Sequence, residues 1–223
     1  MNTKTNPESL QNIVIFKNFS LDEITAALDL LHATTKQNQK GTILLHAGST
    51  TRQMGLVLKG SVTIENNDAW GNRTILSHVS EGHFFAETYA YLGTEPLMVD
   101  VTANEDCDVL FLEIGSLKSL VSEKNPWAVK LTMNLLTIFS QKNLALSGRS
   151  FHISPKTIRG RVMAYLNSLY IKKGTSSFDI PFDRQQLADY LNLERTALSK
   201  ELGKMRDEGL ISFHKNHFSI IAM

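Results

Sequence analysis

Cysteine is nearly absent from this chain of 223 residues, which contains only Cys107. A single cysteine excludes an internal disulfide and any zinc or iron–sulfur site that needs several cysteines. The chain also lacks a run of about 18 apolar residues, so that no membrane span is predicted. Its first residues, MNTKTNPESL, are polar and lack the apolar segment of a secretory signal. We therefore expect a cytoplasmic protein.

A strong net charge is also absent, because the whole chain carries only +1. The charge is nevertheless unevenly distributed. Residues 149–223 hold 12 lysines and arginines and 7 acidic residues, a net charge of +5, whereas residues 1–148 hold 11 and 15, a net charge of −4. A basic C-terminal third suits a polyanionic partner, although a solvated basic surface is the plainer interpretation.

Residues 182–211 predict two short helices joined by a tight turn. Asp183 and Gln186 have the spacing of a capping box at the first helix. Leu198, Leu202 and Met205 form a buried stripe on the second helix. The remaining polar side chains can donate hydrogen bonds to base edges or phosphates, as can the arginine that opens the first helix. These candidate DNA-binding residues are Arg195, Thr196, Ser199, Lys200 and Arg184.

Residues 210–222 predict two short strands around Lys215-Asn216-His217, which would form a wing beside the two helices. The combination indicates a winged helix-turn-helix whose second helix enters the major groove. The alternative is an ordinary helical hairpin whose exposed face is polar.

The N-terminal half predicts short strands. Gly41, Gly48, Gly60, Gly71 and Gly82 separate apolar runs in which side chains alternate, a pattern typical of an antiparallel sandwich or barrel. Cys107 lies beside one of these strands and is interpreted as a packing residue rather than a reactive thiol. We assign residues 1–125 to this domain.

A long helix is predicted from Pro126 to about Gly148. It is apolar on more than one side, which favours packing against its own copy across a two-fold axis. The alternative is burial between two domains of one chain. The helix is assigned to residues 126–149, and the polar residues 147–155 are expected to form a hinge before a C-terminal domain of residues 150–223. The candidate dimer residues are Trp127, Leu131, Leu135 and Ile138.

This order of parts resembles the Crp/Fnr family of bacterial transcription regulators. The resemblance is carried by GTILLHAGSTTRQMGLVLKGSVTI, by EGHFFAE and by RQQLADYLNLERTALSKELGKMRDEGLI. It implies an α+β fold with an N-terminal antiparallel β-roll of the cyclic-nucleotide-binding jelly-roll kind, a long dimerisation helix and a C-terminal winged helix-turn-helix. It also implies a homodimer that binds double-stranded DNA at a palindromic operator, with RNA polymerase and an unidentified small effector as further partners.

Matched by position with the family, Arg195 is a candidate for reading guanine, because its planar fork suits O6 and N7 of that base. Thr196 stands where the family often has a glutamate, and Lys200 stands where an arginine is common. Glu194 occupies a position where serine or threonine usually caps the helix.

The sensory site departs further from the family. Its cyclic-nucleotide binders carry Phe-Gly-Glu and then an Arg-Ser pair that clamps the phosphate. Here Phe85-Ala86-Glu87 retains the glutamate, but Leu97 and Met98 fall at the Arg-Ser positions. The candidate effector pocket therefore implies an effector other than a cyclic nucleotide, or a roll that has lost sensing and is filled by its own side chains.

A second class of function is a cupin-like metal-dependent enzyme or ligand-binding β-roll protein. Such a metal site needs closely paired histidines with a carboxylate, and His78, His83 and Glu87 lack that pairing. The chain also lacks a nucleotide-binding glycine loop of the G-x-G-x-x-G or P-loop kind. We therefore expect no catalytic residues, no metal and no cofactor.

Overall fold

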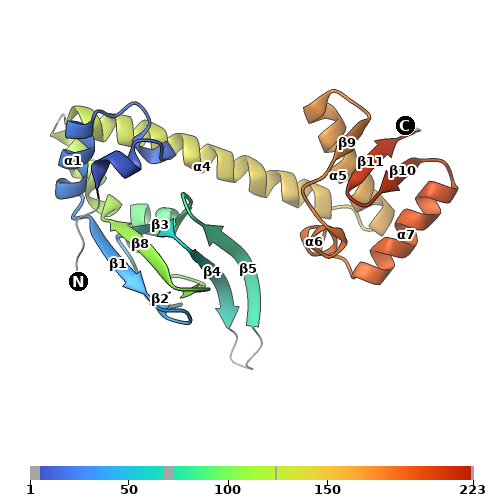
Figure 1. The fold of residues 1–223 in the computed structure, drawn as a ribbon, viewed down its shortest axis with the longest axis horizontal. Coiled ribbons are helices and arrows are strands. Elements are labelled where there is room, and N and C mark those ends of the chain that lie inside the picture. Colours follow the sequence, from blue (N-terminus) through green and yellow to red (C-terminus); the bar gives the residue numbers. More distant parts are fainter. Residues whose placement is uncertain (1–5, 68–72, 124, 222–223) are drawn as a thin grey trace. The chain divides into compact units, whose positions relative to one another are not determined.

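The structure, a computed structural model, describes residues 6–67, 73–123 and 125–221. The chain forms two compact units, Met1–Ile138 and Phe139–Met223 (Figure 1). Among the described residues no helix has the length and apolar character needed to cross a membrane.

The first unit begins with three short helical segments, followed by strands and three further helical segments. The helical segments are η1 (Pro7–Leu10), η2 (Val14–Phe16), α1 (Leu21–Leu30), α2 (Glu87–Leu92), η3 (Ile114–Ser116) and α3 (Leu117–Ser122). The strands are β1 (Thr34–Asn38), β2 (Ile43–Leu45), β3 (Met54–Lys59), β4 (Ser61–Asn67), β5 (Arg73–Ser80), β6 (Phe84–Phe85), β7 (Asp100–Ala103) and β8 (Cys107–Leu112).

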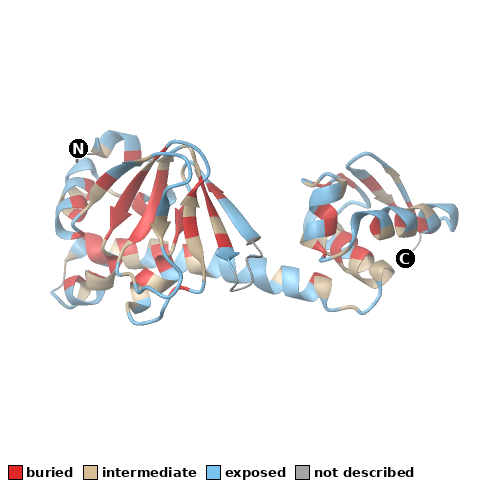
Figure 2. Ribbon diagram, turned by 90° about the horizontal axis from the view of Figure 1, so that it is seen from below, coloured by how far each residue is buried: buried red, intermediate tan, exposed pale blue. Residues whose placement is uncertain are grey.

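These strands form two antiparallel four-stranded sheets, with the orders β1-β8-β3-β6 and β2-β7-β4-β5. The chain passes from one sheet to the other at Gly60, whose φ of +76° suits glycine. Apolar side chains from both sheets meet in one buried cluster. Figure 2 marks the buried residues of these strands in red. The cluster contains Val57, Val62, Val79, Phe85, Val101, Ala103, Cys107, Val109 and Phe111. The predicted antiparallel β-roll is confirmed, and burial raises the pKa of the Cys107 thiol, which suits a packing residue.

Helix α4 (Pro126–Ile153) continues through most of residues 147–155, where a hinge was expected. A single glycine costs a helix only about 1 kcal/mol relative to alanine, so Gly148 does not end it. The helix stops at Ile153, just before Ser154 and Pro155, because a proline disfavours helical geometry in the residue that precedes it.

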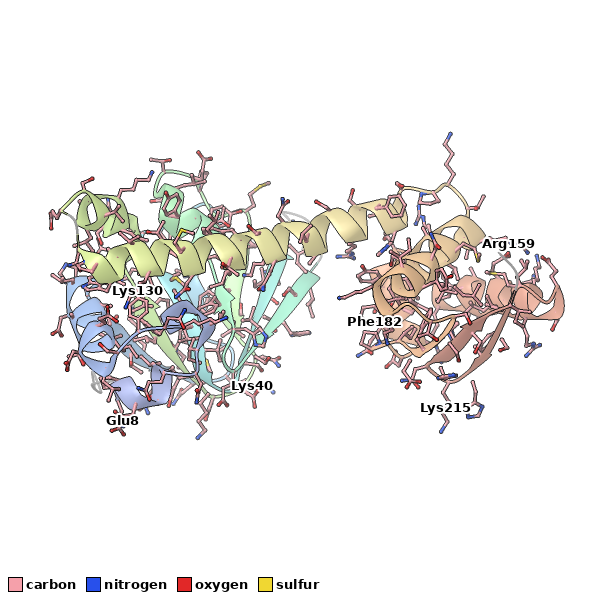
Figure 3. All side chains as sticks on the ribbon, turned by 90° about the horizontal axis from the view of Figure 1, so that it is seen from above. Glu8, Lys40, Lys130, Arg159, Phe182 and Lys215 are labelled. Carbon is pink, nitrogen blue, oxygen red and sulfur yellow. The ribbon has the colours of Figure 1, made fainter. Side chains whose placement is uncertain are left out.

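The four apolar residues predicted to form the dimer face of α4 are buried inside the first unit instead. Lys130, labelled on α4 in Figure 3, lies on the same side of the helix. It forms an ion pair of 2.6 Å with Glu23 of α1. Asn134 donates to the backbone carbonyl of Ile15 at 2.9 Å. Because this side of α4 packs on the N-terminal segment, it is not available to a partner. The exposed fractions are 4% for Trp127, 0% for Leu131, 2% for Leu135 and 5% for Ile138.

The second unit contains α5 (Ile158–Lys173), β9 (Ser177–Asp179), α6 (Arg184–Tyr190), α7 (Arg195–Asp207), β10 (Ile211–His214) and β11 (His217–Ile220). Its three strands form an antiparallel sheet with the order β10-β11-β9. The predicted capping box at α6 is present, with the Gln186 N–H donating to Asp183 at 2.8 Å and the Asp183 N–H donating to Gln186 at 2.9 Å. The predicted winged helix-turn-helix is confirmed.

Candidate functional site

Helix α7 has one buried and one exposed face. Leu198, Leu202 and Met205 are fully buried in the core of the second unit, as their spacing predicted. Arg195, Thr196, Ser199 and Lys200 are all exposed. The structure therefore brings the four predicted residues of this helix to one solvent-facing surface, from which Arg195, Ser199 and Lys200 can donate hydrogen bonds to a polyanion.

Arg184, the fifth candidate, is only partly exposed and contacts the wing. Its guanidinium lies 5.1 Å from the ring centroid of Phe213 and 5.6 Å from that of Phe218, and it donates to the Lys215 carbonyl at 3.4 Å. Burial and the charge of Arg195 lower the pKa of Arg184, although arginine stays protonated in proteins. Arg184 therefore links α6 to the wing, whose turn carries Lys215 (Figure 3).

The N-terminus of α7 is capped by Glu194. Its carboxylate accepts from the backbone N–H groups of Thr196 at 2.9 Å and Ala197 at 2.7 Å. It also accepts a hydrogen bond from the Thr196 hydroxyl. That hydroxyl, the two N–H groups and the charge of Arg195 lower the pKa of Glu194. A carboxylate thus neutralises the positive end of this helix.

Two arginines of α5 hold the helix-turn-helix in shape, and the sequence pattern did not reveal either role. Arg159 donates through Nε to Glu201 at 2.7 Å and through both terminal nitrogens to Glu208 at 2.7 and 2.8 Å. Arg161 donates to the carbonyls of Leu191 and Asn192 at 3.1 and 2.9 Å, in the turn between α6 and α7. These contacts fix the orientation of α7 within its unit.

The last turns of α4 are bound to α6 within the second unit. Arg149 donates to the carbonyls of Tyr190 and Asp189 at 3.1 and 3.2 Å. His152 Nδ1 lies 3.0 Å from the Tyr190 hydroxyl, and burial lowers the pKa of this histidine. Residues Arg149 and His152 lie in the stretch expected to be a hinge, and their contacts explain why it is helical instead.

The predicted effector residues lie around the start of α2. Phe85 is 1% exposed, and its ring packs so closely on Gly55 that a Cβ there would be 2.0 Å from it. Ala86 follows with a left-handed φ of +59° and borders the apolar cluster of the roll. Glu87, the first residue of α2, is 5% exposed.

The two residues at the expected phosphate-clamp positions, Leu97 and Met98, do not face the same pocket, because one is buried and the other is exposed. Leu97 is 3% exposed, and its backbone donates to the Ser49 carbonyl and accepts from the Gly48 N–H at 2.8 and 2.7 Å. Met98 is 77% exposed, so that it does not line the interior. Neither side chain can supply a charge to a phosphate.

No cluster of three or more histidine, cysteine, aspartate or glutamate residues suited to a metal ion occurs in the described part of the chain. His78 instead pairs with Thr63, at 3.1 Å between Nδ1 and Oγ1. His83 Nδ1 lies 3.0 Å from the Glu81 carbonyl.

Two family models match the chain. The cyclic nucleotide-binding domain matches residues 35–124, and the Crp-like helix-turn-helix domain matches residues 160–223. The matches coincide with the β-roll and with the winged helix-turn-helix described above.

Individual proteins agree with these matches over most of the chain. The cAMP-activated global transcriptional regulator CRP of Pasteurella multocida is 22% identical over 189 residues, which cover 83% of this chain and 88% of that protein. Among solved structures, DNR from Pseudomonas aeruginosa has a TM-score of 0.52 at 19% identity and covers 100% of this chain and 96% of its own. The c-di-GMP responsive global regulator CLP of Xanthomonas campestris has a TM-score of 0.56 at 16% identity and covers 92% of this chain and 100% of its own.

Proposed function

Because the chain belongs to the Crp/Fnr family of transcription regulators, we propose that it acts as a homodimer that binds a palindromic DNA operator. The observation that carries this proposal is the exposed polar face of α7 on a helix whose other face is wholly buried. We call α7 the recognition helix. RNA polymerase is the proposed partner through which the bound dimer would act on transcription.

We assign base reading to Arg195 and phosphate binding to Lys200. Arg195 stands in the first turn of the recognition helix, and its fork can donate two hydrogen bonds to O6 and N7 of guanine. Lys200 is exposed further along the helix, and its ammonium group is a point charge without the planar geometry that distinguishes bases.

Binding of the two variants to specific and random duplexes tests this assignment. Arg195→Ala should lose about 1–3 kcal/mol on the specific duplex and relax the preference at one base pair. Lys200→Ala should weaken all duplexes alike and reduce the salt slope by about 0.9, because one phosphate contact is lost. Equal losses on specific and random DNA for Arg195→Ala would contradict its role in reading the sequence.

The outward face of α4 is the proposed dimer surface. It is opposite the buried residues, and its apolar side chains recur at the three- and four-residue spacing of a coiled-coil seam. Large apolar side chains left exposed in this way are typical of an interaction surface. They are Val129, Met133 and Leu136, with exposed fractions of 49%, 57% and 55%.

We further propose that the roll does not sense a cyclic nucleotide. A phosphodiester carries a permanent charge, and burying it without a partner costs several kcal/mol. Leu97 and Met98 offer no such partner. An apolar or aromatic effector, or a roll without an effector, agrees better with the apolar cluster between the sheets.

Calorimetry with cyclic AMP and cyclic GMP at millimolar concentration tests the proposal about the effector. Loss of a buried charge pair, about 3–5 kcal/mol, makes binding a hundred- to several-thousand-fold weaker, so no saturable heat is expected. Saturable binding at micromolar affinity would contradict the proposal and would mean that another cation holds the phosphate.

A further inference from the structure

Glu194 occupies a place at the recognition helix where a DNA phosphate would otherwise be attracted. The first N–H groups of a helix have no partner within it, and with the helix dipole they attract anions. Here the N–H groups of Thr196 and Ala197 already donate to the Glu194 carboxylate. The carboxylate therefore takes the donors that a phosphate would need.

The charge of Glu194 adds repulsion to this occupation. Glu194 is exposed, and its hydrogen bonds with Thr196 and Ala197 lower its pKa, so that it stays ionised near neutral pH. A phosphate approaching the helix terminus would meet a like charge in place of the usual partial positive charge. Arg195 beside it still attracts DNA, but the side chain of Arg195 can extend away from the helix terminus to a base edge.

Glu194 also changes what Thr196 can present to DNA. The Thr196 hydroxyl donates its hydrogen to the carboxylate, so that it has none left for a base or a phosphate. The methyl group of Thr196 then remains for apolar contact, such as with the methyl group of thymine. Thr196 was predicted from sequence as a donor, and this hydrogen bond argues against that role.

We propose that Glu194 is a specificity-determining residue that suppresses binding to DNA of the wrong sequence. Binding to random DNA depends almost entirely on phosphate contacts, whereas binding to the operator also gains from base contacts. Excluding a phosphate at the helix terminus therefore weakens binding to random DNA proportionally more than binding to the operator. This inference rests on the proposed DNA-binding function.

The test measures affinity for an operator duplex and a random duplex over a range of salt concentrations. Glu194→Gln removes the charge at nearly constant shape, and Glu194→Ser replaces it with a neutral residue that caps helices well. Both should bind random DNA about three- to tenfold more tightly at low salt. The salt slope should steepen by about 0.9, because one more phosphate is engaged. Glu194→Asp keeps the charge and a capping side chain and should behave as the unaltered protein does.

The matched control is Asp207→Asn, which removes the same charge at the opposite end of the same helix. If Glu194→Gln and Glu194→Ser match this control on random DNA, net charge alone explains the effect and the proposal is overturned. Weaker operator binding with unchanged random binding would also overturn it, because Glu194 would then contact a base. Failure of the unaltered protein to bind any duplex would instead refute the proposed function and the inference with it.

Discussion

At the scale of single residues, the backbone at Ala86 shows a conflict between sequence and conformation. Among the described residues, non-glycine residues with positive φ are Asn18, His32, Ala86, Asn192 and Lys215. Alanine has no polar side chain that could compensate locally for this conformation, which costs an L-residue roughly 1–2 kcal/mol. The family resemblance implies a glycine at the position of Ala86. The strain follows from placing Phe85 and Glu87 in the interior on either side of it.

We predict that Ala86→Gly stabilises the first unit by about 0.5–1 kcal/mol, because glycine adopts a positive φ without strain but loses more entropy on folding. Urea unfolding followed by tryptophan fluorescence measures this, since Trp127 is buried in the first unit and residues 139–223 contain no tryptophan. Ala90→Gly is the control and should be destabilising, because Ala90 is helical and fully buried. A loss of stability in Ala86→Gly would contradict the left-handed conformation.

At the scale of elements, sequence patterns predicted the helices and strands whose side chains alternate between core and solvent. The cap at α6 and the stripe on α7 follow from local rules, and the structure contains them. Strand β1 was missed because TTKQN is polar and shows no apolar alternation; its pairing with β8 places it in the sheet. The end of α4 was also misplaced, since contacts of Arg149 and His152 with α6 override a polar local sequence.

Helix α4 shows why the faces of an element are harder to predict than the element itself. The sequence predicted an apolar excess, but only the tertiary contacts of Lys130 and Asn134 decide which apolar stripe packs within the chain. The residues predicted to contact a second copy, such as Leu131 and Leu135, lie in the core of the first unit. The exposed stripe that contains Met133 and Leu136 is the proposed dimer surface instead.

We predict that Met133→Lys with Leu136→Lys yields a folded monomer, because charges on the outward face oppose its burial against a second copy. Light scattering at micromolar concentration measures the mass. Gln141→Lys with Ala145→Lys adds equal charge to exposed positions of α4 outside that stripe and should leave a dimer. Leu135→Lys should instead unfold the first unit, since Leu135 is 2% exposed. A monomeric mass for the unaltered protein would contradict the dimer surface.

At the scale of the whole molecule, the order of a β-roll, a long helix and a winged helix-turn-helix was predictable from glycine spacing, apolar periodicity and charge asymmetry. The hydrogen bonds, ion pairs and cation–π contacts that join residues far apart in the chain were not predictable. Arg184 illustrates this, since its contacts with Phe213 and Phe218 depend on the wing folding back onto α6. The lining of the roll interior was also not predictable, since Leu97 is buried whereas the adjacent Met98 is exposed.

The central claim is that a symmetric pair of recognition helices reads DNA. The most direct test is unbiased selection of duplexes bound by the purified protein, with and without cell extract, followed by sequencing. We expect enrichment of a palindrome whose half-sites lie about 10 base pairs apart from centre to centre, as two helices in successive major grooves require. Enrichment of a single asymmetric half-site would contradict the dimeric account. No enrichment under either condition would contradict sequence-specific binding.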